Sequence, residues 1–263
     1  MLKFSANLSM LFTDRPLMER FAAAHAAGFS AVEIQFPYEL DIPRLEKQLQ
    51  DNALELVLIN AGAGDLMSGG DGLACVPGKE AEFRAAVTTA LEYAVPLNIP
   101  AINILSGRQP AGTSRESCMA VLLENLHYAT AACKAAGVKT LVEAINIFDM
   151  PRFLVHSLHD LNFLCDQVNG VQMQFDCYHV SRMGEDVLMA LRNHLAQTGH
   201  IQFADNPGRH EPGSGHIEYE QIFSFLQTSA YAGWCGAEYR PATSTENSLA
   251  WLRSWQEPAH KLP

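Results

Sequence analysis

The chain has 263 residues, 48% of them hydrophobic, and its 18 basic and 29 acidic side chains give a formal net charge of −11. This length suits one large domain or two small ones, and no apolar run of 18 or more residues predicts a membrane span. The acidic balance, with no basic run, argues against a nucleic-acid or anionic-membrane partner. The N-terminus lacks the apolar region and cleavage site of a signal peptide, so we expect a cytoplasmic protein.

Short β-rich runs alternate with longer amphipathic stretches along the chain. The stretches "PLMERFAAAHAAG", "EAEFRAAVTTALEYAVPLN" and "RESCMAVLLENLHYATAACKAAG" have apolar residues at the three-to-four spacing of a one-sided helix. Strands that alternate with helices indicate parallel βαβ units. The predicted strands are 2–8, 31–37, 54–61, 101–107, 140–146, 171–179, 200–205 and 234–239.

A weak internal repeat supports this reading. "AAGFSAVEIQ", "AAGVKTLVEAIN", "VNGVQMQFD" and "YAGWCGAEYR" each contain a glycine that ends a helix, then a short strand, then an acidic residue. Eight such units predict an α/β protein with a single (β/α)8 TIM-barrel domain over residues 1–263, and a doubly wound open sheet is the alternative.

Residues 62–78, "GAGDLMSGGDGLACVPG", form a long glycine-rich connection after the third predicted strand. Long loops of this kind in compact domains are either functional lids or mobile segments. We interpret this one as a candidate active-site lid. The six cysteines are scattered with no C-x-x-C pair, which predicts reduced and mostly buried thiols.

Four polar side chains come late in four successive predicted strands. They are Glu143 in "LVEAIN", Asp176 in "QMQFDCYH", Gln202 in "HIQFAD" and Glu238 in "GAEYRP". In a TIM barrel the carboxyl ends of the strands carry the active site. We therefore expect three carboxylates and one amide to meet at one mouth of the barrel.

Three converging carboxylates repel one another unless a cation lies between them. Oxygen ligands favour Mg²⁺ or Mn²⁺, whereas zinc usually prefers sulfur and imidazole. A single acidic residue at a strand end is more often a solvated terminus or a cap. Four in register on consecutive strands favour a divalent-metal site.

Further polar residues near these strand ends could hold a small oxygenated substrate. His179 follows Asp176 by three residues, and a histidine there is also compatible with a packing role. Arg209, in the loop "DNPGRHEPGSG", suits bidentate capture of a carboxylate, although a surface ion pair is the alternative. Arg240 could shield the same anion, and Glu33 either orients substrate or forms an ion pair.

Several motifs in order along the chain resemble the hydroxypyruvate isomerase family, within the xylose-isomerase-like TIM barrels. They are "FSANLSMLF", "VEIQFPYE", "GGDGLACVPGKEAEFR", "VEAIN" with "DMPRF", "FDCYHVSRM", "HIQFADNPGRHEPGSG" and "GWCGAEYRP". The resemblance runs from residue 1 to about residue 255, and the seventh-strand block is its most specific part.

This resemblance implies a metal-dependent aldose–ketose-type isomerase that interconverts hydroxypyruvate and tartronate semialdehyde, with a role in glyoxylate metabolism. It implies Glu143, Asp176, Gln202 and Glu238 as ligands of Mg²⁺ or Mn²⁺. Glu143 and Glu238 would form the acid/base pair, and His179 would contact substrate. Related sugar epimerases have histidine where this chain has Gln202, and glutamine fits the hydroxypyruvate isomerase branch.

Other functions stay open at this point. A 2-oxo-tetronate isomerase or a ketose 3-epimerase would keep the mechanism and change the substrate. A metal-dependent endonuclease on the same barrel would need histidines and a basic face, and a non-catalytic sugar-acid-binding barrel is the non-enzyme alternative. A small hydroxy or oxo acid is the expected partner, and the oligomeric state stays open, with a homo-oligomer as the alternative to a monomer. We expect Trp251 and Trp255 to pack the last helix onto the barrel, with an interface as the alternative.

Overall fold

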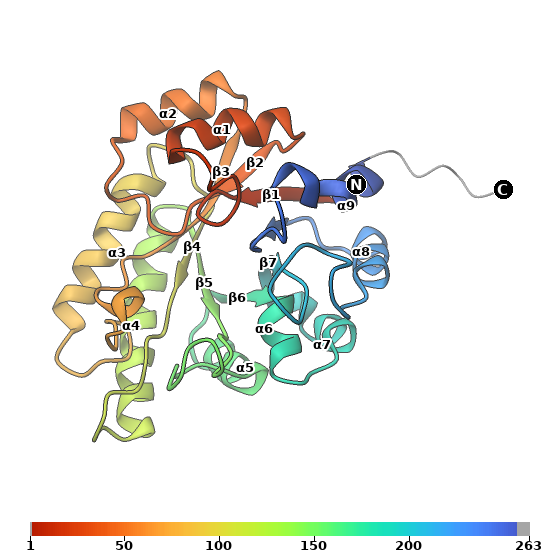
Figure 1. The fold of residues 1–263 in the computed structure, drawn as a ribbon. Coiled ribbons are helices and arrows are strands. Elements are labelled where there is room, and N and C mark those ends of the chain that lie inside the picture. The colour runs from red at the N-terminus through yellow and green to blue at the C-terminus, as the bar shows by residue number, and fades with distance from the viewer. Residues whose placement is uncertain (1, 257–263) are drawn as a thin grey trace.

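Eight parallel strands form a closed barrel in the order of the chain in a computed structural model that describes residues 2–256 (Figure 1). The strands are β1 (Lys3–Asn7), β2 (Ala31–Glu33), β3 (Glu55–Asn60), β4 (Ala101–Ile104), β5 (Lys139–Glu143), β6 (Val171–Asp176), β7 (Thr198–Phe203) and β8 (Trp234–Ala237). The predicted TIM barrel is confirmed, and the open-sheet alternative is wrong because β1 pairs with β8. Residues 1 and 257–263 of the predicted domain lie outside the described part.

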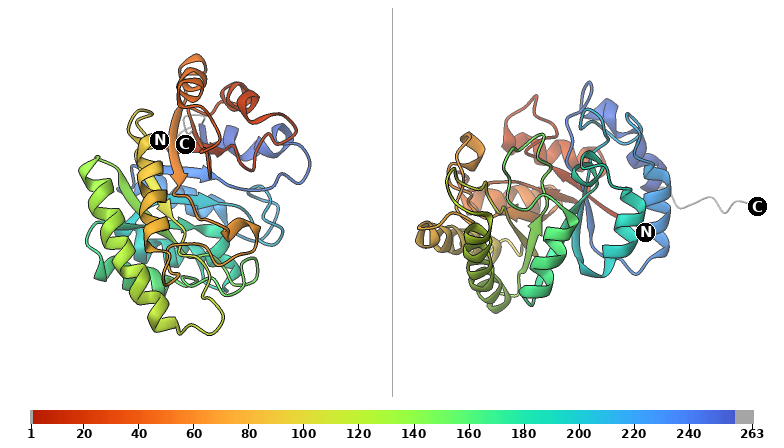
Figure 2. Two further views of the ribbon diagram at one scale, coloured as in Figure 1. Left: turned by 90° about the vertical axis from the view of Figure 1, so that its left-hand side faces the viewer. Right: turned by 90° about the horizontal axis from the view of Figure 1, so that it is seen from below.

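Helices surround the barrel (Figure 2). They are α1 (Leu17–Ala26), α2 (Ile42–Asp51), α3 (Glu80–Ala94), α4 (Arg115–Ala135), α5 (Leu158–Gln167), α6 (Cys177–Arg182), α7 (Val187–His194), α8 (Tyr219–Thr228) and α9 (Ala250–Gln256). Ser114 and Ser157 begin α4 and α5 by accepting a hydrogen bond from a first-turn backbone N–H, as expected of N-cap residues. No helix within residues 2–256 is long and apolar enough to cross a membrane.

Several strands end earlier than predicted. The prediction extended the sixth strand to residue 179, whereas β6 ends at Asp176 and α6 begins at once. Asp176 ends the strand and begins the helix, because its Oδ1 accepts hydrogen bonds from the backbone N–H groups of Tyr178 (2.7 Å) and His179 (3.2 Å). The second strand was predicted to residue 37 but ends at Glu33. In both cases buried residues continue beyond the last residue of the strand, so an apolar pattern overestimates strand length.

The main core lies between the strands and the helices. Trp251 of α9 packs against Phe4 and Phe203 with ring centroids 5.2 and 5.0 Å apart, and Trp255 lies 5.5 Å from Phe223. The predicted packing of the last helix on the barrel is therefore confirmed. All six cysteines are free and five are buried, as expected of small apolar residues.

The interior of the barrel changes from apolar to polar along the strands. Leu58, Ala101 and Leu141 form a small apolar cluster. Residues two positions apart on a strand share a face, so Asn60, Asn103 and Glu143 project from the same strands one layer nearer the carboxyl ends. Polar side chains are thereby gathered at one mouth of the barrel.

Candidate active site

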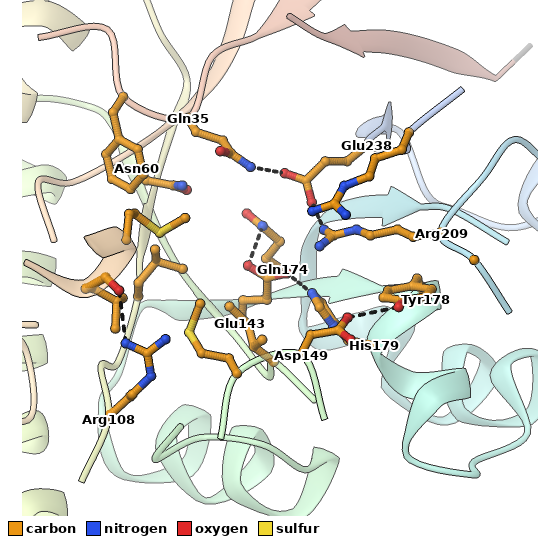
Figure 3. Close-up of a pocket in the computed structure, with 18 residues that line it drawn as sticks. Gln35, Asn60, Arg108, Glu143, Asp149, Gln174, Tyr178, His179, Arg209 and Glu238 are labelled. Carbon is orange, nitrogen blue, oxygen red and sulfur yellow. Dashed lines mark hydrogen bonds and ion pairs between the residues drawn. The ribbon is translucent and has the colours of Figure 1, made fainter. Parts of the chain in front are cut away.

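The four predicted ligands all lie at the carboxyl ends of their strands. Glu143 and Asp176 are the last residues of β5 and β6, Gln202 is the last but one of β7, and Glu238 directly follows β8. Each is at most 5% exposed. A cavity of about 540 Å³ opens beside them, lined by residues that include Glu143 and Glu238 (Figure 3). Asp176 and Gln202 are not part of its lining.

Asp176 has one oxygen engaged and one without a partner. Its Oδ1 caps α6, whereas its buried Oδ2 accepts no hydrogen bond within the described chain. The nearest cationic group is Arg209, whose Nη2 lies 4.0 Å from Oδ2. Burial raises the pKa of Asp176 despite this arginine. Burying a carboxylate oxygen without a hydrogen-bond partner is unfavourable in free energy, so this oxygen is suited to bind a cation or a proton.

Glu143 faces the cavity from β5. Its Oε2 accepts hydrogen bonds from Asn103 Nδ2 (3.2 Å) and Gln174 Nε2 (3.0 Å). Burial, together with the charges of Asp176 and Glu238, raises the pKa of Glu143 well above its usual range. Glu143 is thus a carboxylate whose ionised form requires a compensating positive charge.

Glu238 approaches the same cavity from β8. Its Oε1 accepts hydrogen bonds from Asn7 Nδ2 (3.0 Å) and Gln35 Nε2 (2.9 Å), and its Oε2 from Arg209 Nη2 (2.5 Å). Burial raises the pKa of Glu238 more than the charge of Arg209 lowers it. The two glutamates therefore differ: Glu238 has a cationic partner in hydrogen-bond contact, and Glu143 has only amide donors.

Gln202 and Glu33 form a pair beside this cluster. Gln202 Nε2 donates to Glu33 Oε2 at 2.8 Å, and Gln202 Oε1 accepts from Gln174 Nε2 at 2.6 Å. Glu33 is only 1% exposed and does not line the cavity, so the structure places it behind Gln202. Burial opposes its ionisation, but the charge and hydrogen bond of His200, with bonds from Ser5 and Gln202, hold the pKa of Glu33 below its usual range.

His179 lies 3% exposed against the carboxylates, and its Nε2 is 3.7 Å from Glu143 Oε1. Asn146 determines its tautomer. Asn146 Oδ1 accepts from the N–H groups of Phe148 and Asp149, which orients the amide so that Nδ2 donates to His179 Nδ1 at 2.7 Å. Burial, with Arg209 nearby, holds the pKa of His179 well below its usual range. The neutral ring therefore carries its proton on Nε2, facing the site.

Arg209 and Arg240 both line the cavity. Arg209 has a φ of +58°, donates to Glu238, and its guanidinium lies 5.2 Å from the ring centroid of Tyr178. Arg240 is exposed, and its backbone N–H donates to Arg209 O at 2.8 Å. Asp205 organises the loop that contains Arg209, because its carboxylate accepts from the N–H groups of Asn206, Gly213 and Ile217.

Six polar residues of the cavity were missed by the sequence analysis. They are Gln35, Asn60, Arg108, Asp149, Gln174 and Tyr178. The period-two alternation of a strand could have found Gln174, two residues before Asp176, and Gln35, two residues after Glu33. Arg108 had no comparable signal, because its neighbours come from a distant segment: Arg108 Nη1 donates to Leu66 O (2.9 Å) and Gly70 O (2.5 Å) of the glycine-rich loop.

The donor set fits a divalent cation. Candidate ligand atoms of Glu143, Asp176 and His179 lie within 4.8 Å of one another in buried surroundings. With its proton on Nε2, His179 is a hydrogen-bond donor beside this place, so the carboxylate oxygens are the atoms that would bind the cation. The unpartnered Asp176 Oδ2 and the raised pKa values of three carboxylates are the features that a bound cation would relieve. This buried group could bind a metal.

Comparison with known proteins agrees with this geometry. A family model described as "Xylose isomerase-like TIM barrel" matches residues 21–255. The chain belongs to this family. It is 42% identical to the 2-oxo-tetronate isomerase of Cupriavidus necator, over 96% of this chain and 98% of the relative. It is 43% identical to the hydroxypyruvate isomerase of Escherichia coli K12, over the same shares of both chains. The chain is accordingly an enzyme of the isomerase class.

Solved structures share the barrel. A structure described as an AP endonuclease, family 2, from Brucella melitensis has a TM-score of 0.92 at 37% identity, and the match covers 97% of this chain and 99% of that one. A 3-keto-D-glucoside 4-epimerase from E. coli has a TM-score of 0.82 at 20% identity, covering 97% of this chain and all of the other. The second likeness shows a common fold alone.

Proposed function

We propose that the protein is a divalent-metal-dependent isomerase that interconverts hydroxypyruvate and tartronate semialdehyde (2-hydroxy-3-oxopropanoate). The observation that carries this proposal is the pair of buried glutamates, Glu143 and Glu238, which enter one cavity from β5 and β8 beside the orphaned oxygen of Asp176. The names of the two curated relatives at 42–43% identity support the same reaction class.

Mg²⁺ or Mn²⁺ would be held by Glu143, Asp176, Gln202 and Glu238, an all-oxygen set of the kind these ions prefer. When bound, such an ion acts as a Lewis acid that lowers the pKa of the carbon acid and stabilises the enediolate. Gln202 is neutral, so three carboxylates offset the charge of the cation.

The two glutamates suit proton transfer between neighbouring carbons. One glutamate removes a proton from the hydroxylated carbon, and the other returns a proton to the adjacent carbonyl carbon. The hydroxyl proton passes between the two substrate oxygens, so that the product has the atoms and electrons of the substrate. His179, with its proton on Nε2, donates a hydrogen bond to one of these oxygens.

Arginines on opposite walls of the cavity suit an acidic substrate (Figure 3). Arg209 already neutralises Glu238. Arg240 forms no side-chain ion pair within residues 2–256, and Arg108 bonds only to loop carbonyls through its side chain. The sequence suggested Arg209, with Arg240 beside it, as the partner of the substrate carboxylate. Because Arg209 is paired with Glu238, we expect the carboxylate at Arg240, or at Arg108 on the other wall.

A four-carbon 2-oxo acid is the alternative substrate. One of the two relatives above is named for it, at nearly the same identity as the hydroxypyruvate isomerase. The cavity of about 540 Å³ has room for either acid. An endonuclease activity, the description of the Brucella structure, gains little support from a chain with net charge −11 and three arginines as the only cations of its cavity lining.

The test is metal-dependent isomerisation in deuterated water. The protein is stripped with a chelator, Mg²⁺ or Mn²⁺ is restored, and hydroxypyruvate and the four-carbon acid are followed separately by NMR. We expect turnover only with metal, and a loss of kcat of about 10²–10⁴-fold in both Glu143→Gln and Glu238→Gln. Glu220→Gln, an exposed glutamate on α8, is the matched control. Full activity in either site variant would contradict the proposed acid/base pair.

A further inference from the structure

The geometry points to Glu33 as a positioning residue that fixes the side-chain amide of Gln202 with its oxygen toward the carboxylate cluster. This inference rests on the proposed metal site. It assigns Glu33 neither to the metal nor to the substrate, because Glu33 does not line the cavity and both its oxygens are occupied.

The surroundings of Glu33 provide hydrogen-bond donors and space for a carboxylate. Its Oε1 accepts from Ser5 Oγ at 2.6 Å and contacts His200 Nε2 at 2.8 Å. Strand β8, on the other side of β1, leaves room for it: a Cβ at Gly236 would lie 2.0 Å from Glu33 Oε1. A buried carboxylate without such donors would be strongly unfavourable. These contacts hold Glu33 in place independently of Gln202.

The second oxygen of Glu33 then decides the orientation of the amide. An ionised carboxylate only accepts hydrogen bonds, so the group of Gln202 that faces Oε2 at 2.8 Å is its NH₂. A flipped amide would set two oxygens against each other at this distance. Gln202 Oε1 must therefore point to the opposite side.

The carboxylate cluster of Glu143, Asp176 and Glu238 lies on that opposite side. Gln202 Oε1 accepts from Gln174 Nε2 at 2.6 Å, and the same nitrogen donates to Glu143 Oε2 at 3.0 Å. Gln202 is also paired in register with Asp176 on the neighbouring strand. A chain of contacts thus runs from Glu33 on β2 through Gln202 and Gln174 to Glu143 on β5. Glu33 thereby places a negative charge beside the neutral side chain of Gln202, on the side away from the carboxylate cluster. This orients the oxygen of Gln202 toward the cluster.

The test measures Mn²⁺ binding by electron paramagnetic resonance of the free ion, with chelator-stripped protein. In Glu33→Gln the group facing Gln202 can be either NH₂ or oxygen, so only the bond from Gln174 Nε2 still orients the amide of Gln202. We expect the Mn²⁺ dissociation constant to rise about tenfold or more, as for other partners that orient metal ligands. Glu220→Gln should bind like the wild type.

A swapped pair separates orientation from folding. In Glu33→Gln/Gln202→Glu the two side chains exchange roles, and residue 202 offers oxygen in either orientation. We expect this double variant to bind Mn²⁺ within about threefold of the wild type, while Glu33→Gln alone does not. If Glu33→Gln does not fold, the double variant decides alone: affinity weakened tenfold or more overturns the inference.

The outcomes also distinguish this inference from the proposed function. If the wild type takes up no Mn²⁺ and does not isomerise, the proposed function fails. If the wild type binds and turns over but Glu33→Gln binds Mn²⁺ equally well, only the role of Glu33 fails.

Discussion

At the scale of single residues, the site depends on side chains whose own orientation is fixed by neighbours. Asn146 is the clearest case, because two backbone N–H groups fix its amide and the amide in turn fixes the tautomer of His179. Asn146 also donates to Asp149, which accepts from Tyr178 as well. The histidine is therefore an oriented donor toward the cavity, and its neutral state follows from burial.

We predict that Asn146→Asp weakens catalysis by reversing this orientation. A carboxylate at 146 would accept a hydrogen bond from Nδ1–H, so that Nε2 becomes an acceptor facing the substrate. We expect kcat/KM to fall about tenfold or more, in line with about 1–3 kcal/mol for a lost buried hydrogen bond. Nitrogen NMR of the imidazole should show the proton moved from Nε2 to Nδ1. The exposed Asn193→Asp is the control, and an unchanged tautomer would refute the role of Asn146.

At the scale of elements, the glycine-rich connection 62–78 packs on the barrel mouth through specific contacts. Arg108 N donates to Asp71 O at 2.8 Å, and Arg152 pairs with Asp71 at 3.1 Å. Gly107 permits this approach: it has a φ of +87°, and a Cβ there would lie 2.7 Å from Asp71 O. Leu66 and Met67 of the same segment line the cavity. Its movement as a lid stays a prediction.

We predict that Gly107→Ala displaces this segment and weakens substrate binding. The methyl group would meet the Asp71 carbonyl, so we expect a lower free energy of unfolding, by about 1–3 kcal/mol, and a raised KM with a smaller change in kcat. Gly112→Ala is the matched control, because Gly112 has a φ of +80° but nothing within 4 Å of the added Cβ. It should be destabilised with KM unchanged. Equal KM values in the two variants would contradict the prediction.

At the scale of the whole molecule, the barrel concentrates acidic groups at one mouth in a chain that is already strongly acidic. Glu143, Asp176 and Glu238 all have raised pKa values because burial opposes their charge. Arg209 is the cation in closest contact with them. The folded chain therefore keeps a carboxylate cluster whose charge is incompletely balanced, and a bound divalent cation would stabilise it.

We predict that Mg²⁺ or Mn²⁺ raises the melting temperature of the chelator-stripped protein. Binding to the folded state alone adds about 2.7 kcal/mol at a free metal concentration of 100 times Kd. We expect the shift to be much smaller in Glu143→Gln, and to be absent with NaCl at equal ionic strength. Differential scanning calorimetry measures both. An equal metal-dependent shift in Glu143→Gln would place the metal elsewhere.

The sequence predicted the barrel and the positions of the four strand-end residues because both follow from local periodicity. A strand is recognised by its own apolar run, and in a barrel the carboxyl ends of neighbouring strands meet at one mouth. Glu143, Asp176, Gln202 and Glu238 were found in this way without any knowledge of pairing. The overextended sixth strand marks the limit, because the capping role of Asp176 competes with an unbroken buried pattern.

Only the tertiary structure decided which partner each of these side chains has. The pairing of Glu33 with Gln202 joins residues 169 positions apart, and Asn7 reaches Glu238 across 231 positions. Such contacts depend on closing the sheet so that β1 lies beside β8. Periodicity describes which face a side chain occupies, but hydrogen-bond orientation is fixed by neighbours that only the closed barrel brings within 3 Å. For this reason the strand-end residues could be read from the chain, and their partners could not.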